Sequence, residues 1–579
     1  MFNFSVTISS MKKSLIILIA VFTLICAPAF ASQQTFTYSS HEVQNLLVLA
    51  TMTGTPLPSM TYPITAENMC QMLDVIDDSR LSGPALKMYQ DLKNSLESQS
   101  YLIETRDGKN GIKLNLTILG AEIWKGPAIT DDFDVPFRSS ESFFSEIWHL
   151  PRLSEFKDRI PVASAEAVLN FSNIFTGDFR FDLGINDKTA KPITDTINWE
   201  CLIDAGFIEH DLVTKAYASL GFWNTNLVVG RDKLSAGNGK TGNLELGENQ
   251  LYQDFAKLSA LSYPFSYDFT LAVYDTYPKN WSGDWASYDD YEKNLLNYFK
   301  LDGPVKAVYI HRFSVSLFNR ATLSFYEGAM AYGDGILSDP RVLNPFMFIH
   351  NTFSFKSGNV NNFFGLEAEV NLPANLKFDV QAMLDQFRTA NETSSSGENA
   401  YGILANLSGS WVAGDGILSA YAEYVYNSPS LYLKEYRSLY PLDDSYPYNM
   451  RTEYYKLDLI TGYNNSMVSE FAYLGYKYGG NLHAFGLGAS YMWHGQTFSA
   501  DLFFLSKGEF GIGKGEQRAL DDTEYHYEKT GIIKNSLSIT IGASGTLYKG
   551  LDYRVKAGLV GKEFQFAVAF SVRPLEFFK

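Results

Sequence analysis

The chain has 579 residues, among them 36 Tyr and 42 Phe, yet its mean hydropathy is only −0.12. Its 47 basic and 64 acidic residues give a formal net charge of −17, which disfavours a nucleic-acid partner. After residue 32 no apolar run approaches the ~20 residues of a membrane-spanning helix, so a helical membrane protein is excluded.

Residues 1–31 have the layout of a secretory signal peptide. Lys12 and Lys13 precede an apolar run that ends near Cys26, and Ala29-Phe30-Ala31 supplies the small residues of a cleavage site. The apolar run is shorter than the ~20 residues that a membrane anchor needs. We expect cleavage after Ala31 and a mature chain that starts at Ser32.

The cysteine pattern points to neither a disulfide framework nor a metal site. Removal of the signal peptide leaves only Cys70 and Cys201, and the sequence leaves a single bridge between them open. Their spacing does not match that of metal ligands. We therefore expect no metal and no cofactor.

Residues 32–105 are predicted to form a small helical region. Apolar residues recur at intervals of three and four in three segments, of which Gly54 ends the first and Pro84 opens the third. Each segment has one apolar face, which must be buried against the others or against a larger body. The three faces comprise Val43, Leu46, Leu47 and Ala50; Met69, Met72, Leu73 and Ile76; and Leu86, Tyr89, Leu92 and Leu96.

Residues 106–161 are predicted to be a transition segment, with a first strand at Ile112–Leu119 and a linker. From residue 162 to 579 apolar residues recur at every second position, which is the period of a β-strand. Leu366 and Ala368, for example, flank Glu367, and a charge between apolar neighbours requires a wet face. The Phe residues at 171–181 predict a hairpin around Thr176-Gly177-Asp178.

Nearly the whole of residues 162–579 repeats strand and turn units, which favours an antiparallel transmembrane β-barrel. Several strands approach ten residues, the length of a tilted membrane strand, and ~23 residues per unit gives about 18 strands. Phe564 to Val572 alternate with polar or small residues as a closing strand would, and Phe577 and Phe578 stand near the end, where barrel assembly machinery recognises an aromatic residue. We expect outer-membrane lipid and lipopolysaccharide around this barrel.

Several motifs occur in a characteristic order along the chain. They are Gly230-Arg231-Asp232, Gly237-Asn238-Gly239, Gly242-Asn243-Leu244-Glu245-Leu246, His311-Arg312, Glu327, Asn344-Pro345-Phe346, Met383-Leu384-Asp385-Gln386 and Glu423-Tyr424. With this set the sequence resembles the Wzi-type capsule assembly family of outer-membrane β-barrels. The resemblance implies about 18 strands with a helical bundle that plugs the periplasmic mouth. It further implies a non-catalytic protein that binds or anchors exported capsular or other surface polysaccharide.

Two aromatic stretches with interspersed carboxylates are candidate glycan-binding segments. Aromatic rings stack on the apolar faces of sugars, and carboxylates reach their hydroxyl groups. The alternative interpretation is structural: these residues form aromatic girdles at the membrane interfaces or pack within loops. The candidates are Trp281, Asp284, Trp285 and Tyr288 in the first stretch, and Tyr432, Tyr436 and Tyr440 in the second.

Four charged residues are candidates for ion pairs in the lumen: Arg231, Arg312, Glu327 and Asp385. A charged side chain facing lipid at the midplane would cost roughly 2–4 kcal/mol, so an inward orientation is expected. We expect Arg231 to pair with Glu327 or Asp385. The nearby Gly237-Asn238-Gly239-Lys240 lacks the spacing of a phosphate-binding loop and is interpreted as a turn.

Two further functions stay open. One is a porin-like diffusion channel, against which the N-terminal helices argue, since they would obstruct the lumen. The other is a structural surface protein or adhesin. Catalysis is disfavoured, because His311, His350, His483 and His494 are scattered in separate segments, and Asp521-Asp522 beside His526 is more typical of a solvated loop.

Overall fold

The computed structural model describes most of the expected barrel and helical region. The described residues are 31–58, 60–97, 102–105, 110–125, 151, 153, 160–183, 191–194, 197–201, 213–274, 305–333, 336–338, 344, 360–386, 399–432, 454–461, 467–508 and 533–578.

The three predicted helices are confirmed as α2 (His41–Thr53), α3 (Ala66–Asp74) and α4 (Pro84–Glu97). Ser40 and Thr65 cap the first two, because each side chain accepts a hydrogen bond from a backbone N–H of the first turn. Gly54 ends α2 in the left-handed conformation, with φ of 68°. The predicted apolar faces are buried together, and the wall residues Leu261 and Ile417 join this core.

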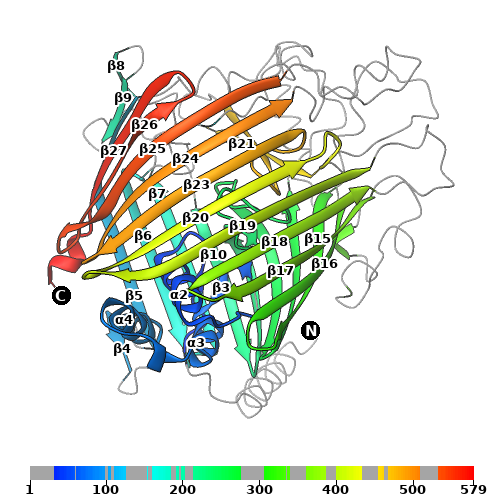
Figure 1. Ribbon diagram of the computed structural model, residues 1–579. Coiled ribbons are helices and arrows are strands. Elements are labelled where there is room, and N and C mark those ends of the chain that lie inside the picture. The colour runs from blue at the N-terminus through cyan, green and yellow to red at the C-terminus, as the bar shows by residue number, and fades with distance from the viewer. Residues whose placement is uncertain are drawn as a thin grey trace, which may run out of the picture.

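Eighteen of the described strands form a closed antiparallel barrel (Figure 1). The last strand pairs with the first, with Val568 opposite Ile123. The strands are β5 (Asn110–Lys125), β6 (Ala163–Phe171), β7 (Phe175–Leu183), β10 (Val213–Phe222), β11 (Thr225–Asp232), β13 (Gln253–Ser262), β14 (Phe265–Tyr274), β15 (Val305–Leu317), β16 (Ala321–Gly333), β17 (Val360–Leu372), β18 (Leu376–Gln386), β19 (Ala400–Ala413), β20 (Gly416–Asn427), β23 (Leu482–Trp493), β24 (Gln496–Gly508), β25 (Ile533–Tyr548), β26 (Leu551–Val560) and β27 (Glu563–Val572).

Smaller strand pairings are not part of this ring. They join β1 (Thr35–Phe36) to β3 (Ile64–Thr65), β2 (Thr61–Tyr62) to β12 (Ser235–Ala236), and β21 (Tyr455–Thr461) to β22 (Met467–Tyr473). At the barrel seam, β4 (Ile103–Glu104) and β9 (Ile197–Cys201) pair with β5, and β8 (Lys191–Thr194) pairs with β9.

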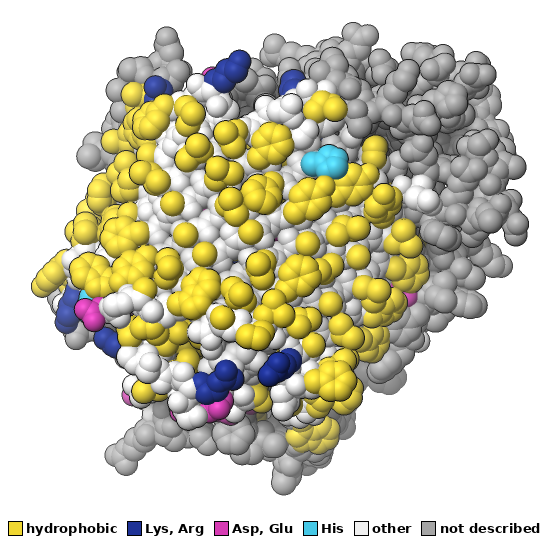
Figure 2. Space-filling model, in the orientation of Figure 1, with side chains coloured by type: hydrophobic (Ala, Val, Ile, Leu, Met, Phe, Trp, Pro, Cys, Tyr) yellow, Lys and Arg dark blue, Asp and Glu magenta, His cyan; other side chains and the backbone are white. Residues whose placement is uncertain are grey.

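The alternation predicted for the closing strand is confirmed. In β27, Phe564 and Phe570 are 55% and 41% exposed, whereas the residues that follow them, Gln565 and Ser571, are buried toward the lumen. Figure 2 shows hydrophobic side chains spread over the outer face of the strands, with Lys and Arg near its upper and lower edges. A closed barrel with an apolar outer face and polar inner positions is the form in which β-strands cross a bilayer. The chain is an outer-membrane β-barrel.

The predicted turn at Thr176-Gly177-Asp178 is wrong, because these residues lie inside β7. The chain reverses at Ser172 and Asn173, which have φ of 51° and 57°. Two successive residues with positive φ form the turn that matches the twist of paired strands, and Asn tolerates this conformation.

The two ends of the barrel differ. Short turns between β6 and β7, β10 and β11, β13 and β14, and β15 and β16 lie at the end that also carries the helices and the C-terminus (Figure 1). Short turns face the periplasm in such barrels, and the longer connections face outward. Among the described residues no helix is long and apolar enough to cross a membrane.

Candidate functional site

The connection between β11 and β13 runs into the lumen, and we call residues 233–252 the inner loop. Its Leu234, Asn238 and Leu244 have no exposed surface. Its strand β12 pairs with β2 of the N-terminal region, and the backbone N–H of Gly237 donates to the carbonyl of Met60 at 2.8 Å. The inner loop and the N-terminal region therefore meet inside the barrel.

The glycines of the inner loop are required where it doubles back. Gly237 has φ of 103°, a conformation that side chains disfavour. A Cβ at Gly239 would overlap the carbonyl oxygen of Gly242. Asn243 stabilises the bend, since its Oδ1 accepts a hydrogen bond from the N–H of Gly239 at 2.8 Å.

Arg312 in β15 is the central cation of the lumen. Its guanidinium forms ion pairs with Glu245 of the inner loop and Glu367 of β17, and the three side chains are at most 2% exposed. The same guanidinium lies 5.6 Å from the centre of the Tyr326 ring. Because Arg312 and Glu367 belong to the wall, the pair with Glu245 fixes the inner loop against β15 and β17.

Other wall residues hold the backbone of the inner loop. Glu423 in β20 accepts hydrogen bonds from the N–H groups of Lys240 and Thr241, at 2.6 and 2.8 Å. Gln381 in β18 accepts from the N–H of Leu244 at 2.9 Å. A carboxylate that accepts from successive N–H groups is a strong partner for a loop that has left regular secondary structure.

The N-terminal region is attached to the wall in the same way. The ammonium group of Lys257 in β13 donates to the carbonyls of Thr61 and Pro63, each at 2.9 Å. Two strands away, in β10, the hydroxyl of Tyr217 accepts from the N–H of Thr35 at 2.8 Å and donates to Asp178 at 3.2 Å. Inward polar groups of the barrel thus bind both segments that enter it.

The structure changes the interpretation of Tyr432. Its side chain has no exposed surface, and its hydroxyl donates to the carbonyl of Leu244 while it accepts from the N–H of Tyr476, both at 2.9 Å. The ring therefore belongs to the aromatic core around the inner loop and offers no free face to a sugar. The other glycan-binding candidates, Trp281, Asp284, Trp285, Tyr288, Tyr436 and Tyr440, lie outside the described residues.

Of the four lumen candidates, Arg312 and Asp385 face inward. Asp385 accepts from the N–H of Tyr432 at 2.8 Å and from the side chain of Asn361 at 3.0 Å. Arg231 is on the other face, because Val228 and Asp232 occupy the inward positions of β11. It pairs with Asp254 at 2.8 Å near the extracellular ends of β11 and β13, where the charge keeps contact with water.

Glu327 is also on the outer side of the wall, since Tyr326 and Met330 in β16 face the lumen core. It is only 1% exposed and accepts a hydrogen bond from Asn362 at 3.4 Å. His311 lies opposite it in the register, and the His311 ring accepts or donates a hydrogen bond with the Tyr267 hydroxyl at 3.0 Å. These residues form a buried polar row on the outer side of β14 to β17.

Sequence reasoning did not single out Lys257, Lys377 or Gln381 as functional. Their only signal was the alternation of polar and apolar residues, which assigns them to the lumen without identifying their partners. Among the described residues no group of three or more His, Cys, Asp or Glu side chains is arranged to hold a metal ion.

No protein-family model matches the sequence, and no curated protein matches it. Among solved structures, the barrel is similar to Wzi of Escherichia coli, with a TM-score of 0.54, 12% identity and coverage of 93% of this chain and 99% of that chain. OccK8 of Pseudomonas aeruginosa gives a TM-score of 0.36 at 13% identity, with 80% and 97% covered. The outer-membrane channel DcaP of Acinetobacter baumannii gives a TM-score of 0.30 at 10% identity, and the alignment covers 82% of this chain and 99% of that chain. Wzi is described as an outer-membrane protein involved in group 1 capsule assembly and a carbohydrate-binding β-barrel. At 12% identity the similarity shows that the chain shares the barrel fold of Wzi.

Proposed function

We propose that this outer-membrane barrel binds or anchors surface polysaccharide, without catalysis, on a scaffold whose lumen is obstructed. The meeting of the inner loop with the N-terminal region inside the barrel carries the proposal. A diffusion channel needs a continuous wet path, whereas here two segments from opposite ends of the barrel pair within it.

The use of the inward charges supports an obstructed lumen. Arg312, Glu367, Lys257 and Glu369 are each buried and are engaged with other protein groups. Charges that served a passing solute would remain hydrated. Here they hold the inner loop and the N-terminal region, so the polar interior acts as an attachment surface for the protein's own segments.

The binding surface belongs on the external side, where a polysaccharide is present. Wzi is a carbohydrate-binding barrel, and its shared fold supports the same class of ligand for this chain. In the sequence, the aromatic and carboxylate residues at 281–288 follow β14, and Tyr436 and Tyr440 follow β20; both strands end at the extracellular side of the barrel. Their chemistry suits stacking on sugar rings.

The test is retention of polysaccharide on cells that produce the Trp281→Ala/Trp285→Ala double variant. We expect cell-attached polysaccharide to fall and shed polysaccharide to rise, at equal amounts of folded barrel. Trp223→Ala is the matched control, because Trp223 is an exposed tryptophan in a periplasmic turn. Unchanged retention in the double variant, or equal loss in the control, contradicts the assignment of this segment.

A diffusion channel is the second candidate, and one feature of the wall favours it. Small and charged residues face inward on β25 and β26 and keep partial exposure to water: Thr540, Gly542, Ser544, Arg554 and Lys556. Conductance across a planar bilayer separates the two functions. The obstructed barrel predicts no steady current from the purified protein, and a large steady current would support the channel instead.

A further inference from the structure

A groove of about 680 Å³ runs along the outer wall of the barrel, from β11 to β17. It is within the range of ~300–1,000 Å³ that holds small ligands in proteins. The groove faces away from the lumen, since its lining residues Phe265 and Leu366 are each 62% exposed, whereas the next residue in each strand, Ser266 or Glu367, is buried inward.

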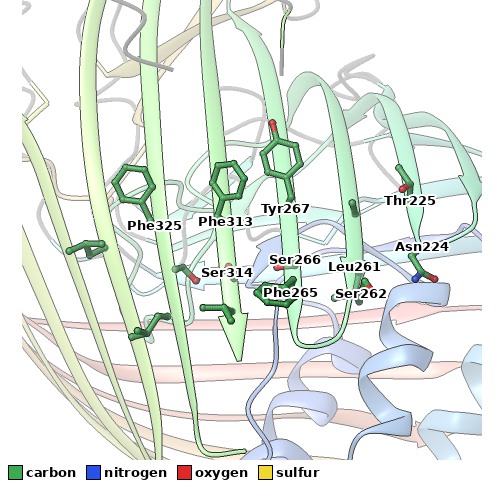
Figure 3. A pocket seen from close by; sticks show the side chains of 15 residues that line it. Asn224, Thr225, Leu261, Ser262, Phe265, Ser266, Tyr267, Phe313, Ser314 and Phe325 are labelled. Atoms are coloured by element: carbon green, nitrogen blue, oxygen red, sulfur yellow. Dashed lines mark hydrogen bonds between the residues drawn. The ribbon is translucent and has the colours of Figure 1, made fainter. Parts of the chain in front are cut away.

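Two rows of apolar side chains line the groove (Figure 3). In the upper row, Tyr267, Phe313 and Phe325 stand on neighbouring strands in direct register, and the first two rings are 4.7 Å apart. In the lower row, Phe265 lies opposite Val315. At the β13 side, the small outward residues Thr225 and Ala260 leave the space open.

The level of the groove in the membrane follows from the turns below it. Trp223, Tyr263 and Phe318 occupy three adjacent periplasmic turns and are 63%, 43% and 91% exposed. Exposed aromatic residues at strand ends mark the boundary between lipid and water. The lower row begins at Phe265, two residues after Tyr263, so the groove lies in the periplasmic half of the bilayer.

The groove is bounded above and has a cation below. Above the upper row lies the buried polar row of His311 and Glu327, joined to the groove through the Tyr267 hydroxyl. Below it, exposed Arg320 lies in the turn between β15 and β16, next to the β13–β14 turn, as the hydrogen bond from Ser316 N–H to Pro264 C=O at 2.8 Å shows. An apolar cavity with a cation at the water boundary matches an amphiphile with an anionic head.

We propose that the groove binds one acyl chain of an anionic glycerophospholipid of the periplasmic leaflet, with its phosphate beside Arg320. Lipid acyl chains surround the apolar belt of a barrel at this depth, so an apolar occupant is available there. The polar row above the groove ends the apolar path, and the positive charge of Arg320 attracts the phosphate to the level of the turn.

The test is native mass spectrometry of the full barrel released from nanodiscs that contain equal amounts of phosphatidylglycerol and phosphatidylcholine. We expect the wild-type protein to retain phosphatidylglycerol in preference to phosphatidylcholine. Ala260→Trp fills the groove and should lower lipid retention about tenfold, the effect of excluding roughly two methylenes. Ala420→Trp is the control, because Ala420 also faces outward but lies on β20, away from the groove.

Two further variants distinguish binding of the acyl chain from recognition of the headgroup. Phe265→Ala removes a largely exposed wall residue and should also lower retention, which covers the case in which Ala260→Trp folds poorly. Arg320→Gln should remove the preference for phosphatidylglycerol while leaving total retention nearly unchanged. The proposal is overturned if Ala260→Trp and Phe265→Ala both retain lipid like the wild type, if Ala420→Trp loses it equally, or if Arg320→Gln keeps the preference. Recovery of lipopolysaccharide in place of phospholipid from outer-membrane extracts would also overturn it.

Discussion

Arg312 in β15 and Glu245 in the inner loop form a buried ion pair across 67 positions of the sequence. The pair joins a rigid wall strand to a loop that has no regular secondary structure beyond β12. Glu367 holds the other side of the guanidinium, so Arg312 is anchored within the wall as well. The pair therefore converts an otherwise adaptable loop into a fixed part of the lumen.

Replacing Arg312 by Met should destabilise the barrel strongly. Removing one partner of a buried ion pair leaves uncompensated charge and costs about 3–5 kcal/mol. Arg231→Met is the matched control, because the Arg231–Asp254 pair is partly exposed and such pairs contribute only ~0–1 kcal/mol. Denaturant unfolding in lipid vesicles measures both free energies. Similar losses in the two variants would contradict the role given to Arg312.

Glu423→Ala should loosen the inner loop without unfolding the barrel. The N–H groups of Lys240 and Thr241 lose a charged acceptor, and such hydrogen bonds contribute about 1.5–3 kcal/mol. Hydrogen exchange at these two amides should accelerate by about 10- to 100-fold in the variant. Glu423→Gln keeps one acceptor oxygen, so its exchange rates at these amides should lie between those of Glu423→Ala and the wild type. Equal exchange in all three proteins would remove Glu423 from the set of loop anchors.

Lys257→Met should release residues 61–63 of the N-terminal region from the wall. The carbonyls of Thr61 and Pro63 lose their ammonium donor, so exchange and protease access should rise locally, and brief current openings should appear in a bilayer. Lys377→Met is the control, because Lys377 is similarly buried but pairs with Glu369 of the wall at 3.1 Å. Openings of the same frequency in both variants would show that general destabilisation, and not release of the N-terminal region, is the cause.

The helices and the closing strand could be predicted because both have a strict period. One face of α2 and every second residue of β27 must be apolar to meet a core or a lipid, and that requirement is visible in the sequence. The predicted turn at Gly177 is wrong because the chain reverses at Ser172 and Asn173, which adopt positive φ without a glycine.

The face occupied by a single charged residue could not be predicted. A shift of one residue in a strand moves a side chain from the lumen to the outer face. The inward orientation expected for Arg231 and Glu327 is therefore wrong, although both residues lie in the part of the chain predicted to form the barrel. The inner loop was also invisible to periodicity, since its burial depends on contacts with Arg312, Gln381 and Glu423 from strands far away in the sequence. Its local signals were the glycine-containing motifs at 237–239 and 242–246, and such motifs are equally typical of an exposed turn.

Cys70 provides a pH-dependent test of burial in the helical region. It is a free cysteine in α3, and burial raises the pKa of its thiol from 9.0 to about 12. The native thiol should resist alkylation at pH 8 and react once the helices unfold. Because the folded state binds this proton more tightly, stability should be unaffected below pH 9 and fall by about 1.4 kcal/mol per pH unit between pH 9 and 12. The Cys70→Ala variant lacks this titration, so the difference between the two unfolding curves isolates it. A difference that stays constant across this range would mean that the thiolate is accommodated in the folded helices.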